Sequence, residues 1–380
     1  MNHLLKIITI SILSNSAFLY AQNLELQGQL SAWGTVNADQ VSESQTGVRY
    51  IPELSLTKSV TPSLTLDSEM SFNIFGSGQF HQSEDFETNS DLKPYRMWLR
   101  LSTSQFEARI GLQKINFGSA SLLRPLMWFD RIDPRDPLQL TDGVYGLLLR
   151  YFFLNNANIW LWGLYGNDDI KGWEMIPSYK EKPEFGGRVQ LPFLQGELGL
   201  SVHHRKADLE KGLLGLIPLG DGSVDENRIA LDGKWDVEVG VWFESTFIHM
   251  NTDALPFSYS HLLNVGLDYT FGLGNGLVVI GEHFIFDSSD QPFGSDERFS
   301  FSALSLNYPL GLLDMITGMV YYDWENRDWY RFISFQRSYD HWQIYLMGFW
   351  NPDQFQIYQN FSDGSLFAGK GIQIMVVFNH

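Results

Sequence analysis

The sequence FEARIGLQ at residues 106–113 alternates strictly, with apolar side chains at even positions and polar side chains or glycine at odd ones. Successive side chains of a β-strand point to opposite faces, so this period of two predicts a strand with one apolar and one polar face. Similar alternation occurs at 95–101, 237–247, 263–271 and 342–350. In the first of these the apolar face comprises Tyr95, Met97, Leu99 and Leu101. Segments of roughly ten residues with this alternation are typical of membrane-spanning β-barrels.

The connections between these segments alternate between short and long along almost the whole chain. Short connections are expected near 59–62, 103–105, 154–157, 193–196, 235–238, 272–276, 309–313 and 338–340. Long ones are expected near 37–46, 76–92, 115–141, 167–183, 206–226, 250–257, 287–297 and 351–366, with 325–328 as a short exception. Outer-membrane barrels join their strands by short periplasmic turns and long extracellular loops. We therefore predict an all-β, transmembrane, antiparallel up-and-down barrel in the bacterial outer membrane, with both termini periplasmic.

Counting strands in this way gives about eighteen, an even number as single-chain bacterial barrels show. Sixteen is the alternative, because 278–286, 296–308 and 329–337 alternate poorly. The final segment, 372–378, alternates and ends on the aromatic Phe378. It is similar to the terminal strand that the barrel-assembly machinery recognises, with Asn379 and His380 as a departure. A soluble periplasmic β-sandwich is the rival fold.

Residues 1–21 are predicted to be a cleaved signal peptide, with Lys6 before an apolar stretch and Ala21 before the cut. Residues 22–380 would then form a single barrel domain. The chain has no cysteine, which excludes disulfides, thiolate metal sites and a lipid-anchored N-terminal cysteine. Loss of Lys6 changes the net charge from −18 to −19. Such an acidic chain is not expected to bind nucleic acid, because phosphate binding needs clustered Lys and Arg.

The polar faces of the first predicted strands carry many charged residues. The arginines are Arg96, Arg100, Arg109, Arg150 and Arg188. The acids are Glu53, Asp67 and Glu69, beside Arg49. An arginine facing lipid near the midplane would cost about 2–4 kcal/mol, so these side chains are expected to face the lumen. We interpret them as a charged pore wall that selects solutes. The alternative is that they only form ion pairs that fill or stiffen the lumen.

The longest predicted connection, residues 115–141, contains many apolar side chains, among them Leu122, Leu123, Trp128 and Phe129. A solvated loop tip would not be so apolar, and we therefore expect this third long loop to fold back into the barrel. Its charged residues would then face the arginines across a constriction. These residues are Asp130, Arg131, Asp133, Arg135 and Asp136. A structured lid at the mouth is the alternative.

The run RIGLQKINFG at 109–118, followed by RIDPRD at 131–136, resembles a pattern of alginate-export-like and related outer-membrane porin families. The pattern is RxGxQxxxxG followed by (N/D)PxD. The expected inward-folding third loop is also similar to the constriction loop of general porins. The resemblance implies a barrel for permeation or export and does not name its solute.

We therefore expect a porin-like channel for passive diffusion or export of small polar or anionic solutes. Its expected partners are outer-membrane lipid, the assembly machinery, these solutes and further copies of the chain. A structural or partner-plugged barrel is the alternative, and a barrel enzyme is a third possibility. The sequence contains no Gly-x-Ser-x-Gly, His-Glu-x-x-His or P-loop motif, so we expect no enzyme activity, cofactor or metal. His203 and His204 are expected at the rim, and 221–226 as a solvated acidic loop tip.

Overall fold

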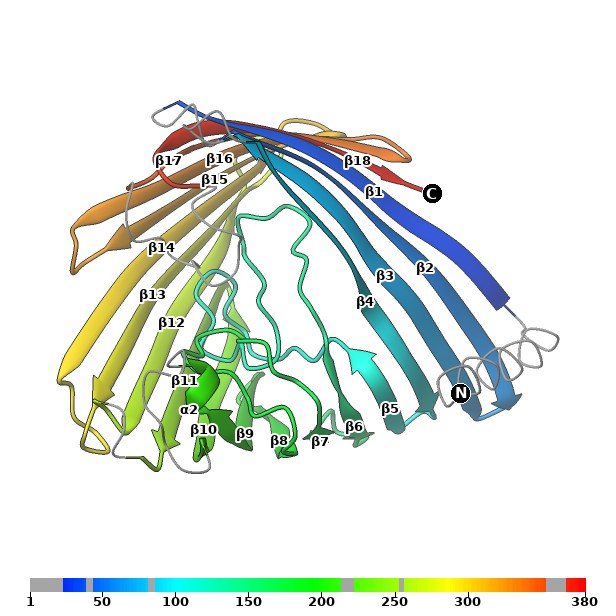
Figure 1. The fold of residues 1–380 in the computed structure, drawn as a ribbon, viewed down its shortest axis with the longest axis vertical. Helices are drawn as coiled ribbons and strands as arrows, with labels where there is room; N and C mark the ends of the chain where they lie inside the picture. Colours follow the sequence, from blue (N-terminus) through cyan, green and yellow to red (C-terminus); the bar gives the residue numbers. More distant parts are fainter. Residues whose placement is uncertain (1–22, 39–43, 81–85, 213–221, 253–255, 353–366) are drawn as a thin grey trace.

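The computed structural model describes residues 23–38, 44–80, 86–212, 222–252, 256–352 and 367–380. The predicted signal peptide lies outside these residues. Within them the chain forms one antiparallel sheet of eighteen strands that closes on itself as a barrel (Figure 1). Among the residues described, no helix is long and apolar enough to cross a membrane.

The first nine strands are β1 (Asn23–Asn37), β2 (Gln45–Thr61), β3 (Leu64–Phe80), β4 (Phe86–Ser102), β5 (Phe106–Gln113), β6 (Val144–Phe152), β7 (Asn158–Leu164), β8 (Glu184–Phe193) and β9 (Gly196–Asp208). A short helix, α2 (Leu209–Gly212), follows β9. The remaining strands are β10 (Ser223–Val237), β11 (Val239–Met250), β12 (Tyr259–Phe271), β13 (Leu277–Ser289), β14 (Glu297–Pro309), β15 (Asp314–Asp323), β16 (Asp328–Ser338), β17 (Trp342–Trp350) and β18 (Lys370–Asn379).

Every strand pairs with its neighbours in sequence, and β18 pairs with β1 to close the ring. The closing register runs from Gln29 opposite Asn379 to Asn37 opposite Gly371. The backbone of His380 also exchanges two hydrogen bonds with Gly28, so the residues after Phe378 extend the seam. The prediction of eighteen strands and an up-and-down barrel is confirmed, and the alternative of sixteen is wrong.

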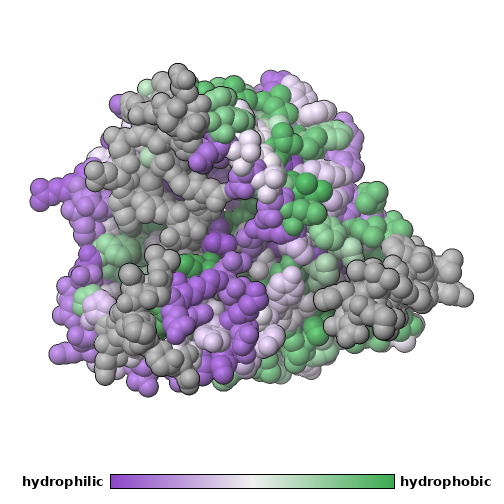
Figure 2. All heavy atoms as spheres, in the orientation of Figure 1, coloured by the Kyte–Doolittle hydropathy of each residue, from purple (hydrophilic) through white to green (hydrophobic). Residues whose placement is uncertain are grey.

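The barrel has its apolar side chains outside and its polar side chains inside. On β5, outward-facing Ile110 is 58% exposed, while Gln113 on the other face is fully buried. On β11, Val239 and Val241 are exposed and Glu244 is buried. In Figure 2, hydrophobic side chains lie toward the right-hand and upper margins of this face, and hydrophilic ones crowd its left and centre. This is the reverse of a soluble protein, and it is expected where lipid surrounds the barrel and the lumen is polar.

The strands that alternate poorly in sequence have apolar residues on both faces. Inward-facing Phe284 of β13, Phe301 of β14 and Tyr330 of β16 are almost fully buried within the lumen. Apolar residues on both faces of a strand remove the period-two signal. The weak alternation of 278–286, 296–308 and 329–337 therefore indicates that something apolar covers their inner faces.

Most connections sort by length as expected, and the link between β15 and β16 is short as predicted, but the connection between β3 and β4 is no longer than the short ones between β6 and β7 and between β12 and β13. One boundary prediction is wrong, because much of 76–92 is strand: β3 continues to Phe80 and β4 starts at Phe86. Another correction concerns Tyr95. A register shift between Ser71 and Phe72 in the pairing of β3 with β4 leaves Tyr95 as an extra residue. Such a bulge re-aims a side chain, and Tyr95 lines an internal cavity instead of the outer face.

Because the apolar face of each strand points outward, an introduced arginine should destabilise the barrel on the outer face and not on the inner face. Met70 of β3 faces outward and is 41% exposed, whereas Ser55 of β2 faces the lumen beside Glu53. Met70→Arg should destabilise the barrel by about 2–4 kcal/mol, because it places a guanidinium in lipid. Ser55→Arg, the matched control, should leave stability nearly unchanged. Urea unfolding in lipid vesicles measures both, and equal effects of the two substitutions would contradict the assignment of the faces.

Candidate functional site

The connection between β5 and β6, residues 114–143, lies inside the barrel (Figure 1). Its apolar side chains are buried in two clusters that join it to different parts of the inner wall. Leu122, Leu123 and Met127 pack against the apolar inner faces of β12 to β16. A second group packs on β6, β7 and β10 and comprises Ile115, Phe117, Leu126, Trp128 and Phe129. The structure thus places the segment predicted at 115–141 in the lumen and not as a lid over the mouth.

Glu244, on the inner face of β11, binds the backbone of this loop across the lumen. Its Oε1 accepts hydrogen bonds from the N–H groups of Ser119 and Ala120 at 2.5 and 2.8 Å. Its Oε2 accepts one from Leu126 at 3.2 Å. The carboxylate is fully buried and satisfies three loop N–H groups that water cannot reach.

Glu282, on the inner face of β13, binds the next three residues in the same way. It accepts hydrogen bonds from the N–H groups of Ser121, Leu122 and Leu123 at 2.6, 3.1 and 2.7 Å. Asn264 of β12 donates to the same carboxylate at 3.0 Å and to the carbonyl of Leu123 at 2.8 Å. The two glutamates therefore attach the consecutive residues 119–123 to the wall opposite the root of the loop.

The connection between β7 and β8, residues 165–183, also folds inward and packs on the first loop. The Trp173 ring stacks on Phe284 with centroids 4.6 Å apart, and its indole N–H donates to the carbonyl of Arg124 at 2.9 Å. The N–H of Gly172 donates to the carbonyl of Asp130 at 3.1 Å. The two loops therefore form one packed body inside the barrel.

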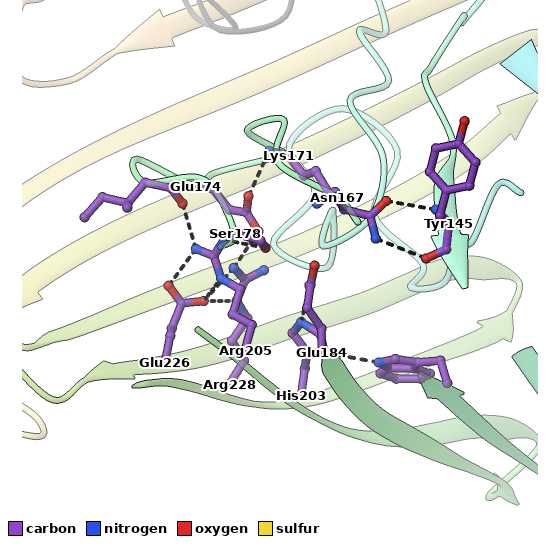
Figure 3. Close-up of polar contacts among 12 residues, drawn as sticks. Tyr145, Asn167, Lys171, Glu174, Ser178, Glu184, His203, Arg205, Glu226 and Arg228 are labelled. Carbon is purple, nitrogen blue, oxygen red and sulfur yellow. Dashed lines mark hydrogen bonds and ion pairs between the residues drawn. The ribbon is translucent and has the colours of Figure 1, made fainter. Parts of the chain in front are cut away.

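A buried charge network fixes the second loop to β9 and β10 (Figure 3). Arg205 of β9 binds both Glu226 of β10, at 2.6 Å, and Glu174 of the loop, at 3.2 Å. Arg228 of β10 binds the same two carboxylates at 2.6 Å each. Removing one member of such a network would leave an uncompensated buried charge, which is strongly unfavourable. The network therefore holds the loop in one position.

Two sequence predictions are corrected in this region. His203 is not at the rim but 3% exposed inside the barrel, where it accepts the indole N–H of Trp162 at 3.1 Å and lies 3.3 Å from Glu184. Glu226 is not on a solvated loop tip, since it lies on β10 within the buried network. Within the described part of the chain, no group of three or more His, Asp or Glu side chains is arranged to hold a metal ion.

The two loops leave one side of the lumen unfilled. A cavity of about 540 Å³ lies between the inner faces of β1 to β4 and β18 and loop residues between 131 and 142. Trp33, Arg49 and Phe75 line the barrel side, and Arg131 and Asp136 line the loop side. Any passage that follows this cavity is therefore bounded by a rigid wall on one side and by the folded-in loop on the other.

The predicted arginines lie on the inner faces of β4, β5, β6 and β8, and most of them are paired. Arg96 is buried and donates to the carbonyl of Thr141 at 2.9 Å, which ties β4 to the end of the loop. Arg100 and Arg109 are direct cross-strand partners. Arg150 stacks on Trp160 with its guanidinium carbon 3.8 Å from the ring centre.

Of the predicted acids on the same wall, Asp67 pairs with an arginine, and Glu69 and Glu53 accept hydrogen bonds from neutral donors. Asp67 binds Arg100 at 3.0 Å. Glu69 accepts the indole N–H of Trp98 at 3.1 Å, and Glu53 accepts the Ser55 hydroxyl at 2.9 Å. Glu107, which we had not singled out, lies 3.0 Å from Arg109 and 3.7 Å from Arg150. Arg188 belongs elsewhere, since it is buried against Asp232 of β10 in a bidentate pair.

The charged residues of the loop pair differently from the expectation. Asp130 binds Arg124 at 2.9 Å and Asp133 binds Arg135 at 2.7 Å, within the loop, where we expected them to face the arginines of the wall. Arg131 binds Asp142 at 3.2 Å. Asp136 accepts the N–H groups of Leu138 and Leu140 at 3.0 and 3.2 Å and lines the cavity.

No protein-family model matches the chain, and no curated protein sequence matches it. Solved structures match over nearly its full length. OpdK of Pseudomonas aeruginosa, determined with vanillate, gives a TM-score of 0.60 at 11% identity and covers 95% of this chain and 99% of that one. OccAB1 of Acinetobacter baumannii gives 0.56 at 9% identity, covering 95% and 96%. OpdQ of Pseudomonas aeruginosa gives 0.55 at 8% identity, covering 94% and 98%.

The chain has a porin-type β-barrel fold. At these identities the likeness concerns the path of the backbone and not the side chains that line the lumen. The attachment of loop 114–143 to Glu244 and Glu282 rests on the contacts of this chain alone.

Removing the carboxylate of Glu282 should release loop 114–143 from the barrel wall. Glu282→Ala should leave the N–H groups of residues 121–123 without their partner and destabilise the docked loop by on the order of 3 kcal/mol. We expect protease cleavage within 114–143 in the folded barrel and a larger single-channel conductance. Glu197→Ala, at an exposed glutamate of β9, is the matched control. Equal protease resistance of the two variants would contradict the anchoring role.

Proposed function

We propose that the barrel is a channel of the bacterial outer membrane through which small polar solutes diffuse passively. After removal of the signal peptide, both termini would lie on the periplasmic side with the short turns. The observation that supports this proposal best is the 540 Å³ cavity, which remains beside the folded-in loops of a barrel with an apolar exterior. A barrel that served only as a scaffold would have no need for an aqueous space lined by both signs of charge.

The charged wall of β4 to β6 would act as a polar vestibule next to this cavity. Arg100, Arg109 and Arg150 alternate there with Asp67 and Glu107. Because each carboxylate is bound by one or two guanidinium groups, the wall presents fixed dipoles and not a single sign of charge. Such a wall would orient solutes that carry polar groups and would favour small anions modestly over a purely acidic pore.

Ion selectivity tests the wall directly. The purified barrel should give stepwise current in planar lipid bilayers. Arg100→Glu should shift the reversal potential under a salt gradient toward cation preference, because it reverses a charge that is 32% exposed to the lumen. Lys182→Glu makes the same charge change on an exposed stretch of loop 165–183 and should shift it much less. A barrel without current would contradict the channel, and equal shifts would contradict the wall.

The pH dependence of selectivity tests the loop side of the cavity. Burial raises the pKa of Asp136 above its ordinary value. As the pH falls, Asp136 should therefore take up its proton before an ordinary aspartate does, and the ion selectivity should shift toward anions in that early step. The folded state holds this proton more tightly than the unfolded chain does. Lowering the pH through the raised pKa of Asp136 therefore stabilises the folded state. Asp136→Asn should remove the early step, and an unchanged titration in this variant would contradict the assignment.

A further inference from the structure

Two aromatic side chains with parallel rings line the cavity wall, Trp33 on β1 and Phe75 on β3. A side chain at Gly47 would clash with the Trp33 ring, so the indole lies against the backbone of β2. The ring of Phe75 on β3 is parallel to it within 1°, with centroids 6.4 Å apart. Both rings line the cavity and are only partly buried. Together they present apolar faces to an aqueous space.

Apolar surface left in water is unfavourable, so these ring faces would be stabilised by a solute that covers them. Elsewhere in the lumen large rings are covered by protein, as Phe284 is by Trp173. Trp33 and Phe75 are covered only in part: the Arg49 guanidinium lies over both rings, and Trp33 also packs against the cluster that contains Tyr345 and Met375. A solute in the cavity would complete the cover. This is the first requirement on a bound solute: one face must be flat and apolar.

Polar side chains share the cavity with the two rings. The guanidinium carbon of Arg49 lies 5.4 Å from the centre of Trp33 and 5.5 Å from that of Phe75. The carboxamides of Asn73 and Gln373 line the same cavity. A carboxamide both donates and accepts hydrogen bonds, as a hydroxyl group does. The second requirement is therefore an edge rich in groups that donate and accept.

The charges around the cavity argue for a neutral solute. Four acids line it, Asp91, Asp133, Asp136 and Asp142, against three bases, Arg49, Lys93 and Arg131. Asp142 is bound by both Lys93 and Arg131, at 2.9 and 3.2 Å. Arg49 lines the barrel side of the cavity and Asp136 lines the loop side. A solute with a net charge would meet repulsion from one of these walls.

We propose that this cavity is a binding subsite for a neutral saccharide. A sugar ring has a flat C–H face, which would stack on Trp33 and Phe75, and an equatorial edge of hydroxyl groups. The edge would donate to Asp136 and the carboxamide oxygens and would accept from Arg49 and the carboxamide N–H groups. The subsite rests on the proposed channel, and it narrows the solute class from small polar molecules to polyhydroxylated neutral ones.

Saccharide block of the open channel tests the subsite. Maltotriose added to one side of a bilayer should reduce the wild-type current in a saturable way. Trp33→Ala should weaken this block about tenfold, the factor that corresponds to about 1.4 kcal/mol of lost stacking. Trp324→Ala removes an exposed aromatic ring that follows β15, outside the cavity lining and the charged wall, and should leave the block unchanged. Sodium benzoate, a planar anion of similar width, should block weakly or not at all.

The outcomes separate the subsite from the channel. Stepwise current with no saturable block by maltotriose, or with saturable block by benzoate alone, would overturn the saccharide subsite and leave the channel standing. Absence of current would overturn the channel. In that case calorimetric titration of the folded, detergent-solubilised barrel with maltotriose still measures the subsite: binding that Trp33→Ala weakens would support it, and no binding would overturn it.

Discussion

A loop can fold into the lumen of a barrel only if its backbone N–H groups find partners there, because a buried N–H without one is strongly unfavourable. In this chain two glutamates on the opposite wall meet that requirement. Glu244 and Glu282 accept hydrogen bonds from residues 119–123 and from Leu126. A carboxylate can accept several such bonds at once, so two side chains suffice for six loop residues. The position of the first loop depends on this attachment, and the second loop packs on the first.

The lumen is asymmetric because Glu244 and Glu282 attach the loop to one side of the barrel wall. The loop is drawn toward β11 and β13, where its apolar residues cover the inner faces of β12 to β16. The second loop packs on the first and is fixed by Arg205 and Arg228. Among the described residues these two loops do not fill the space beside β1 to β4, and the polar and aromatic residues there line the cavity that we propose a solute enters. The position of the loops therefore determines which strands of the barrel line the cavity.

Much of this could be predicted from the sequence because it depends on local periodicity. The alternation in 106–113, the sorting of connections by length and the apolar run in 122–129 each indicate their structure without knowledge of distant residues. The partners of buried charges could not be predicted in this way. Glu282 lies about 160 residues from the loop it holds, and Arg188 pairs with Asp232 across an intervening strand. Tyr95 was misplaced because a single bulge residue shifts the alternation by one position.

The chain contains no cysteine, so single introduced cysteines can report which side of the lumen is open. Asn73→Cys would lie on the cavity wall, and Ala230→Cys would lie on the inner face of β10 beneath the loop, at a position that is 2% exposed. The direct measurement is the rate at which a charged, water-soluble thiol reagent modifies each variant in the folded barrel, with the channel current recorded in parallel. Rapid modification at 73 that reduces the current, together with protection at 230, is the result predicted here. Equally rapid modification at both positions would contradict a lumen filled on one side by its own loops.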